Sequence, residues 1–393
     1  MAKLLEITGK AISGEWGQDD DTGTGIPVLR TTNFTNEGFV NYKNVVTRSI
    51  SKKNIAEKYL RHGDIIIEKS GGSDKQPVGR VIFFEGEENK YLFNNFTGLL
   101  RVQNPEEWLP KYVFYALYAY YRNGGTRAFE NRTTGLHNLQ VDNYVKSVDI
   151  PKLSYRKQQH ICETLDHVRD AVAYRERQLT KLDELVKARF VEMFGDVISN
   201  SNLWPICKFS EITSSRLGKM LDAKQQTGVH RYPYLANFNV QWFRFELKTL
   251  NSMDFNESDR IEFELHDGDL LVCEGGEIGR CAVWHNNVQP CYFQKALHRV
   301  RCNKDFILPD FLAWWFKYNC DHGGFSAIEG AKATIAHLPG AKLKNLDVCV
   351  PPLPLQNQFA AFVAEVDKSK VEVQKALDQT QLLFDSLMQQ YFG

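Results

Sequence analysis

The sequence predicts an α+β protein built from two tandem domains, each followed by a long helix. Short β-type runs, such as residues 64–68 (DIIIE) and 269–274 (DLLVCE), alternate with Gly-rich turns and one or two helices. The same succession of segments then recurs about 200 residues further along the chain. We therefore expect domains at residues 1–150 and 198–350, with long helices at residues 151–197 and 351–393.

The first long helix is predicted by a stripe of apolar residues whose spacing alternates between three and four. Arg175 and Arg189 interrupt this stripe at positions where an apolar residue is due. About 40 helical residues form a rod of roughly 60 Å. A rod with one apolar stripe needs a partner, and the helix-pairing residues expected here are Ile161, Leu165, Val168, Val172, Leu179, Leu182 and Val186.

The last segment of the chain is the predicted partner. Each long helix follows a strand-like run that ends in proline, and each segment closes on an aromatic-glycine pair. Two ordinary core helices, each packing on its own domain, are the open alternative. The helix-pairing residues expected in the second helix are Val363, Val366, Val373, Leu377, Phe384 and Leu387.

Four pairs of strings carry the internal repeat. PVGRV at 77–81 matches EIGRC at 277–281, and HGDIIIEKSGG at 62–72 matches DGDLLVCEGGE at 267–277. GIPVLRTTNF near the start matches RYPYLANFNV, and His137 and His337 precede their prolines at the same spacing. The loops between these strings differ. A shared frame with different loops is expected of two domains that bind different versions of one ligand.

Composition narrows the class of protein. The 393 residues are 43% hydrophobic and 24% charged, which suits a folded protein of two to three domains. We find no apolar run of ~20 residues and no signal-peptide core, so a cytoplasmic location is expected. The eight cysteines include no CxxC pair. Reduced core residues are expected at Cys273, Cys281, Cys291, Cys302 and Cys349, with a zinc site as the alternative. A net charge of +0 means that any DNA contact needs local patches or a basic partner.

The chain resembles the specificity subunit of type I restriction-modification systems over essentially its whole length. The resemblance rests on the GD(I/L)(I/L)…GxxGR frame, on TTGLHNLQVDNYVKSVDIP and ATIAHLPGAKLKNLDVCVPPLP, and on the Gln-rich helix starts. It implies two target-recognition domains that each read one half of a bipartite DNA sequence. It also implies two long helices that pack as an antiparallel coiled coil with pseudo-twofold symmetry.

The same resemblance implies the partners. Two modification (methyltransferase) subunits are expected to dock on the helices, and restriction subunits to join that complex. The chain would catalyse nothing and bind no cofactor itself, while S-adenosylmethionine, ATP and Mg would sit on the partner subunits. Because a DNA turn is about 34–36 Å, we hypothesise that helix length sets the unread spacer between the half-sites.

Candidate DNA contacts lie on the loops, where Lys and Arg suit phosphates and polar side chains suit base edges. Each could instead be a solvated surface residue. Arg80 and Arg280 could be structural ion pairs, and His137 and His337 could hold a scaffold turn. The candidates are Arg30, Thr32, Asn33, Lys69, Ser70, Ser73, Lys75, Gln76, Arg132, Thr133, Thr134 and His137 in the first block, and Asn237, Glu277, Arg280, Lys332, Thr334 and His337 in the second.

Enzyme functions lack support in the sequence. There is no (N/D)PP(Y/F) motif with a Gly-rich cofactor loop, and no GxxxxGK[ST] nucleotide loop. GDIIIEK at 63–69 superficially resembles an acidic metal site, but a strand after a Gly-Asp turn explains it better. Two alternatives stay open: a scaffold for other proteins that does not bind DNA, and a nuclease or methylase with an unrecognised site.

Overall fold

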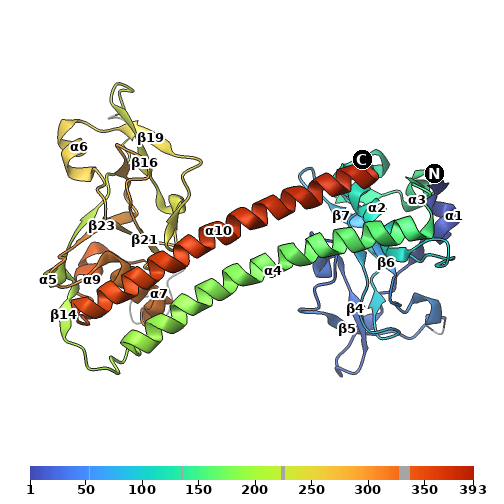
Figure 1. Cartoon of the computed structure of the whole chain (residues 1–393), viewed down its shortest axis with the longest axis horizontal. Coiled ribbons are helices and arrows are strands. Elements are labelled where there is room, and N and C mark those ends of the chain that lie inside the picture. Colours follow the sequence, from blue (N-terminus) through green and yellow to red (C-terminus); the bar gives the residue numbers. More distant parts are fainter. Residues whose placement is uncertain (53, 134–135, 223–225, 327–336) are drawn as a thin grey trace. The chain divides into compact units, whose positions relative to one another are not determined.

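The computed structural model describes residues 1–393 except 53, 134–135, 223–225 and 327–336 (Figure 1). The chain forms two compact units, Met1–Glu176 with Lys375–Gly393, and Arg177–Gln374. The helices α4 (Tyr155–Phe194) and α10 (Leu353–Phe392), 40 residues each, contribute residues to both units. Among the described residues, no helix is both long and apolar enough to cross a membrane.

In its described residues, the first unit combines small sheets with the short helices α1, α2 and α3. A four-stranded sheet has the order β2-β10-β6-β8, and a second has the order β3-β5-β4-β9. The helices are α1 (Leu4–Thr8), α2 (Pro110–Arg122) and α3 (Val141–Ser147), with 3-10 turns at Thr31–Asn33, Ala56–Lys58 and Gly125–Phe129. The strands are β1 (Ala2–Lys3), β2 (Ile12–Ser13), β3 (Gln18–Asp19), β4 (Ile26–Leu29), β5 (Val46–Ser49), β6 (Ile65–Glu68), β7 (Ser70–Gly72), β8 (Val81–Phe83), β9 (Leu92–Phe93), β10 (Thr97–Leu100), β11 (Glu130–Thr133), β12 (Leu136–Leu139) and β13 (Asp149–Ile150).

The second unit follows the same plan. Its four-stranded sheet has the order β15-β23-β20-β21. The helices are α5 (Phe209–Ile212), α6 (Glu257–Phe263), α7 (Pro309–Asp321) and α9 (Gly340–Lys344), with a 3-10 turn at Asn237–Asn239. The strands are β14 (Ile206–Lys208), β15 (Thr213–Leu217), β16 (Arg231–Leu235), β17 (Val240–Gln241), β18 (Arg244–Phe245), β19 (Asn251–Asp254), β20 (Leu270–Cys273), β21 (Cys281–Val283), β22 (Tyr292–Phe293), β23 (Leu297–Cys302) and β24 (Asp347–Cys349).

The two units share strand pairings as well as strand order. In each unit the second strand of the four-stranded sheet pairs antiparallel with the third, β10 with β6 and β23 with β20. In each a parallel pair (β4–β9, β16–β22) lies next to an antiparallel neighbour, β5 or β19. In each a first strand pairs with the last strand before a long helix, β1 with β13 and β14 with β24. The predicted mixture of helices and strands is confirmed.

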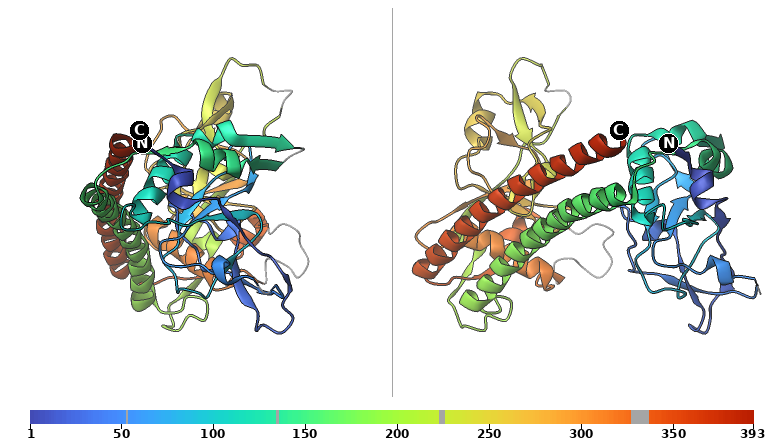
Figure 2. Two further views of the ribbon diagram at one scale, coloured as in Figure 1. Left: turned by 90° about the vertical axis from the view of Figure 1, so that its right-hand side faces the viewer. Right: turned by 45° about the vertical axis from the view of Figure 1, so that its right-hand side comes forward.

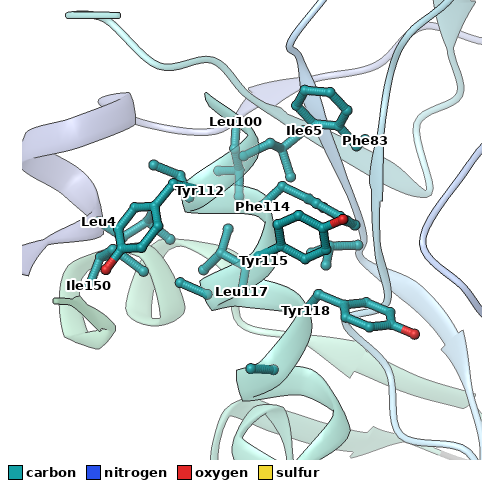
Figure 3. Packing of buried hydrophobic residues seen from close by; sticks show 14 of the residues in the cluster. Leu4, Ile65, Phe83, Leu100, Tyr112, Phe114, Tyr115, Leu117, Tyr118 and Ile150 are labelled. Carbon is teal, nitrogen blue, oxygen red and sulfur yellow. The ribbon is translucent and has the colours of Figure 1, made fainter. Parts of the chain in front are cut away.

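The core of the first unit forms around α2. Its side chains Tyr112, Phe114 and Tyr115 are almost fully buried. Figure 3 shows Phe114 toward Ile65 and Phe83 of the sheet, and Tyr112 beside Leu4 and Ile150. The same apolar cluster takes in side chains from both long helices, namely Ile161, Leu165, Phe384 and Met388. Burial of this apolar surface is what fixes the ends of α4 and α10 to the domain in this unit.

The second unit repeats this arrangement with aromatic side chains from both long helices and from α7. Phe190 of α4 lies 5.4 Å from Phe359 of α10 and 5.8 Å from Phe311 of α7, ring centroid to ring centroid. Within each unit, early residues of one long helix therefore pack with late residues of the other, so the two run antiparallel there. Figure 2 draws α4 and α10 each as one continuous helix.

The expected helix-pairing residues are all buried or half-buried, from Ile161 through Val186 and from Val363 through Leu387. The spacing near the end of α4 differs from the expected heptad. Val186, Phe190 and Phe194 are buried at steps of four, and Arg189 lies over the ring of Phe362 with 5.9 Å from its guanidinium carbon to the ring centroid. Each step of four overshoots one turn of a 3.6-residue helix by about 40°, so the buried stripe here winds around α4 instead of following the heptad seam.

Candidate DNA interface

The Gly-Asp turns of the repeat are structural. Gly63 and Gly268 both have positive φ (91° and 86°), which disfavours other residues there. The Asp64 carboxylate accepts two hydrogen bonds of 2.7 Å from Arg101, and the Asp269 carboxylate accepts bonds of 2.7 and 3.2 Å from Arg301. These carboxylates are occupied by arginine, which favours a turn before a strand over a metal site. The described part of the chain contains no cluster of three or more His, Cys, Asp or Glu that could hold a metal.

The GxxGR strings also belong to the shared frame. Nη2 of Arg80 donates to the carbonyl oxygen of Thr31 at 3.3 Å, and Nη2 of Arg280 donates to that of Asn237 at 3.0 Å. Arg80 is also paired with the buried Glu68 carboxylate at 3.0 Å. The guanidinium of Arg280 therefore holds the 3-10 turn at Asn237–Asn239. This contact fits the structural alternative, and a DNA contact by Arg280 stays a prediction.

The burial of Asn33 is contrary to its prediction as an exposed DNA contact. Its side chain is only 1% exposed; the amide nitrogen donates to the carbonyl oxygens of Asn41 and Lys43, and the amide oxygen accepts from the backbone N–H of Arg30. Asn239 makes the equivalent three bonds in the second unit. A buried amide with all these groups occupied fixes a turn and cannot reach DNA.

His137 and His337 do not occupy equivalent positions, contrary to the predicted spacing. His137 is buried in β12, and its Nδ1 lies 3.0 Å from Oε2 of Glu130. His337 is exposed and bridges to Gly275. The backbone N–H of the next residue, Leu338, donates to Glu274, just as that of Leu139 donates to Lys69. His337 thus corresponds to Asn138, because the two blocks are offset here by 199 residues, as α2 and α7 are, and not by the predicted 200.

The loop at residues 73–77 is the most exposed part of the predicted interface in the first unit. Ser73, Lys75 and Gln76 are all exposed, and the backbone N–H of Gln76 donates to the Ser73 hydroxyl at 3.2 Å. Glu130, which the sequence analysis missed, anchors the base of this loop. Its Oε1 accepts from the N–H of Val78 at 3.1 Å and its Oε2 contacts His137. The exposed side chains of Ser73, Lys75 and Gln76 therefore lie on a loop whose base is fixed by hydrogen bonds. Such a loop suits contact with bases or phosphates.

The corresponding region of the second unit is built differently. Trp242 donates from Nε1 to the Glu277 carboxylate at 2.7 Å, and the Lys317 ammonium lies 4.9 Å from the centroid of the Trp242 ring. The amide nitrogen of Asn237 donates to the carbonyl of Gly275 at 3.1 Å, while its amide oxygen is buried and has no hydrogen-bond partner among the described residues. Neither partner of Trp242 is adjacent to it in sequence, so no local pattern could have identified this cluster.

The two units also differ in charge at one equivalent backbone position. Lys69 and Glu274 make the same two backbone hydrogen bonds, yet one is cationic and the other acidic. Nζ of Lys69 donates to the hydroxyl of Ser13 at 3.0 Å, and burial, aided by Lys58, lowers the pKa of Lys69 below its usual value. Lys69 and Glu274 carry opposite charges at equivalent positions. The two units therefore present different electrostatic surfaces to a ligand.

The remaining predicted DNA contacts differ in how exposed they are to solvent. Thr32 is exposed, whereas Arg30 and Ser70 are half-buried; Nη2 of Arg30 donates to the carbonyl of Asn44 at 3.0 Å. Thr134, Lys332 and Thr334 lie outside the described residues. Arg132 and Thr133 lie in β11, and their side chains are likewise outside the description.

The buried cysteines Cys273 and Cys291 have thiols with raised pKa values, as expected in an apolar core. Burial raises the pKa of Cys273 to about 11 and that of Cys291 to about 12, and both thiols lie in the apolar interior of the second unit. A thiol that is protonated at neutral pH is a poor nucleophile and a poor metal ligand.

Part of the chain matches a known family model, and its fold is similar to solved structures. Residues 202–380 match the family model described as type I restriction modification DNA specificity domain. The fold is similar to the crystal structure of the type I restriction-modification S subunit from M. genitalium, with a TM-score of 0.57 and 14% identity over 100% of this chain and 95% of that one. It is also similar to a structure titled for complex assembly and conformational transition of the type I R-M system, with a TM-score of 0.60 and 14% identity over 100% and 96%.

Proposed function

We propose that the whole chain reads a bipartite target in double-stranded DNA, a proposal supported by the match of residues 202–380 to the type I restriction modification DNA specificity domain model. Each unit supplies one recognition domain for one half-site. The observation that carries the proposal is the recurrence of one frame with different exposed groups. The Asp64–Arg101 and Asp269–Arg301 pairs and the buried Asn33 and Asn239 repeat, whereas the loops around them do not.

Pseudo-twofold symmetry of the two domains follows from this proposal. Tandem domains joined by antiparallel helices face opposite strands of a duplex as a homodimer does. The paired helices then act as a spacer, because α4 and α10 are each 40 residues long and about 60 Å in length. Adding or removing whole turns of both helices should alter the unread spacer and leave both half-sites unchanged.

The helices are also the proposed docking surface for two modification subunits. Leu185 of α4 and Leu383 of α10 are 48% and 50% exposed, and each lies 30 residues after the first residue of its helix. Tyr174 and Val371, eleven or twelve residues before them, are also exposed, close to three helical turns away. Equivalent apolar residues on two related helices suit two copies of one partner.

Catalysis is assigned to the partners. S-adenosylmethionine, ATP and Mg are proposed to bind the modification and restriction subunits, and this chain is proposed to bind no cofactor. The acidic residues that most resemble a metal site, Asp64 and Glu68, are held by Arg101 and Arg80.

A scaffold that does not bind DNA is the second candidate function, favoured by the net charge of +0. DNA affinity measured across a salt series separates the two. A DNA reader loses affinity steeply as the salt concentration rises, because phosphate contacts release counterions. A scaffold shows no DNA affinity at any salt concentration, either alone or with its modification subunits.

A further inference from the structure

Each unit contains an equivalent junction between the end of a domain helix and the late part of a long helix. The domain helices α2 and α7 both begin at a proline, Pro110 and Pro309, which makes Arg122 and Asp321 equivalent. The long helices begin at Tyr155 and Leu353, which makes Lys187 and Asp385 equivalent. In the first unit α2 meets the end of α10, and in the second unit α7 meets the end of α4.

An ion pair occupies this junction in both units, with its charges reversed. Arg122 of α2 pairs with Asp385 of α10 at 2.7 Å in the first unit. Asp321 of α7 pairs with Lys187 of α4 at 3.5 Å in the second unit, where Lys317 also contacts Asp321. The domain helix is therefore cationic and the long helix anionic at one junction, and the opposite holds at the other.

The residues packed next to these pairs are apolar at both junctions. Val186 and Phe190 of α4 correspond to Phe384 and Met388 of α10, and all four are buried. Because the equivalent residues differ in volume, exchanging the helix ends would cost packing energy, but it would still place apolar surface on apolar surface. The ion pairs add a difference in charge that is complementary in only one combination.

We propose that the reversed ion pairs select the pairing of the first half of the chain (residues 1–197) with the second half (198–393), and disfavour pairing of identical halves from two chains. Two first halves would place Arg122 opposite Lys187. Two second halves would place Asp321 opposite Asp385, with Lys317 offsetting part of that repulsion. A tandem protein with permissive apolar seams needs such a feature to avoid exchanging halves between chains.

The test uses the whole protein, cut once after folding. A protease site inserted between Asn202 and Leu203, where both residues are exposed, separates the halves while every other contact remains. Native mass spectrometry then follows whether the halves stay in mixed pairs or re-sort into identical pairs at equilibrium. Cutting removes the tether, which otherwise favours the pairing within one chain.

Two charge-conserving double variants make the test specific. Arg122→Asp with Asp385→Arg keeps both native pairs attractive but makes identical halves equally compatible, so identical pairs should rise about tenfold over the parent protein. Lys187→Asp with Asp385→Lys makes both native junctions repulsive and both identical pairings attractive, so identical pairs should predominate. Glu365→Lys with Lys368→Glu reverses an exposed pair within α10 and should change nothing.

The proposal is supported if the parent protein keeps mixed pairs and the two variants shift in this order. It is overturned if the cut parent re-sorts freely, or if its halves separate without re-forming mixed pairs. It is equally overturned if all three variants give the distribution of the parent. None of these outcomes depends on DNA binding, so failure here is distinct from failure of the proposed function.

Discussion

Gln158 and Gln356 make the same three hydrogen bonds at the start of the two long helices. The side chain of Gln158 accepts from the N–H of Leu109 at 2.8 Å and donates to the carbonyls of Glu107 and Leu153. Gln356 accepts from Leu308 at 2.8 Å and donates to Phe306 and Pro351. One buried amide thus joins three backbone segments: the loop before the domain helix, the link after the last strand, and the long helix.

Replacing Gln158 with Leu should destabilise the first unit by about 2–4 kcal/mol, because it leaves buried backbone groups without partners. Chemical denaturation followed by circular dichroism measures this change. Gln159→Leu is the matched control, since Gln159 is exposed in the next position of the same helix turn. Equal stability of the two variants would contradict the role assigned to Gln158.

Acid should weaken the second unit through His298. Burial lowers the pKa of His298 below its usual value, with His337 and Lys344 acting in the same direction, although its bond to the Leu338 carbonyl and nearby Glu274 oppose the shift. The folded state therefore binds fewer protons than the unfolded state. This contribution to stability is complete above the unfolded pKa of about 6.5 and is lost as pH falls through the window below it.

The variant His298→Gln should show a smaller fall in Tm between about pH 7.5 and pH 5.5 than the parent protein. Tryptophan fluorescence suits this measurement, because Trp204, Trp242, Trp284, Trp314 and Trp315 all lie in the second unit. His62→Gln, at an exposed histidine of the first unit, is the control. An unchanged pH dependence in His298→Gln would show that other groups cause the loss.

Docking of the modification subunits should depend on the exposed leucines of the helices. Leu185→Asp and Leu383→Asp should each remove one of two bound copies, and the double variant should remove both, because a charge on an apolar contact is costly to bury. The mass of the co-expressed complex reports the number of copies. Leu203→Asp changes a leucine that is 86% exposed and lies off the helices, and should retain both. Two copies bound to the double variant would place docking elsewhere.

The exposed loop of the first unit should contribute to only one half-site. Lys75→Ala with Gln76→Ala should weaken binding of the full target by about 1–3 kcal/mol, through loss of phosphate or base contacts, and should leave the second half-site fully discriminated. Competition with DNA duplexes altered in one half-site at a time measures this. An equal loss of discrimination at both half-sites would contradict the assignment of this loop to one half-site.

Local chemistry explains which parts of the fold could be predicted from sequence. The Gly-Asp turns depend on a positive φ at Gly63 and Gly268 and on an adjacent carboxylate, and both features are visible in a short string. The seams of α4 and α10 follow from helical periodicity in the same way. In each case the residues that determine the structure are neighbours in the chain.

Long-range contacts explain the parts that could not be predicted. Asn33 lies in a polar string typical of a loop, yet the carbonyls of Asn41 and Lys43 bury and occupy its amide. The positions of His137 and His337 depended on counting residues through loops of unequal length. Glu130 anchors the N–H of Val78, which lies 52 residues earlier in the chain, and no pattern relates the two.

The central claim is that each unit reads its own half of one DNA target. An adenine methylation map of cells that express this chain with its methyltransferase, compared with cells that lack the chain, tests it most directly. The loops at residues 73–77 and 275–278 are changed in turn. We predict a split motif with a fixed unread gap that appears only with the chain, and one altered half for each loop. Methylation that is independent of the chain, despite a stable complex with the methyltransferase, would contradict the claim.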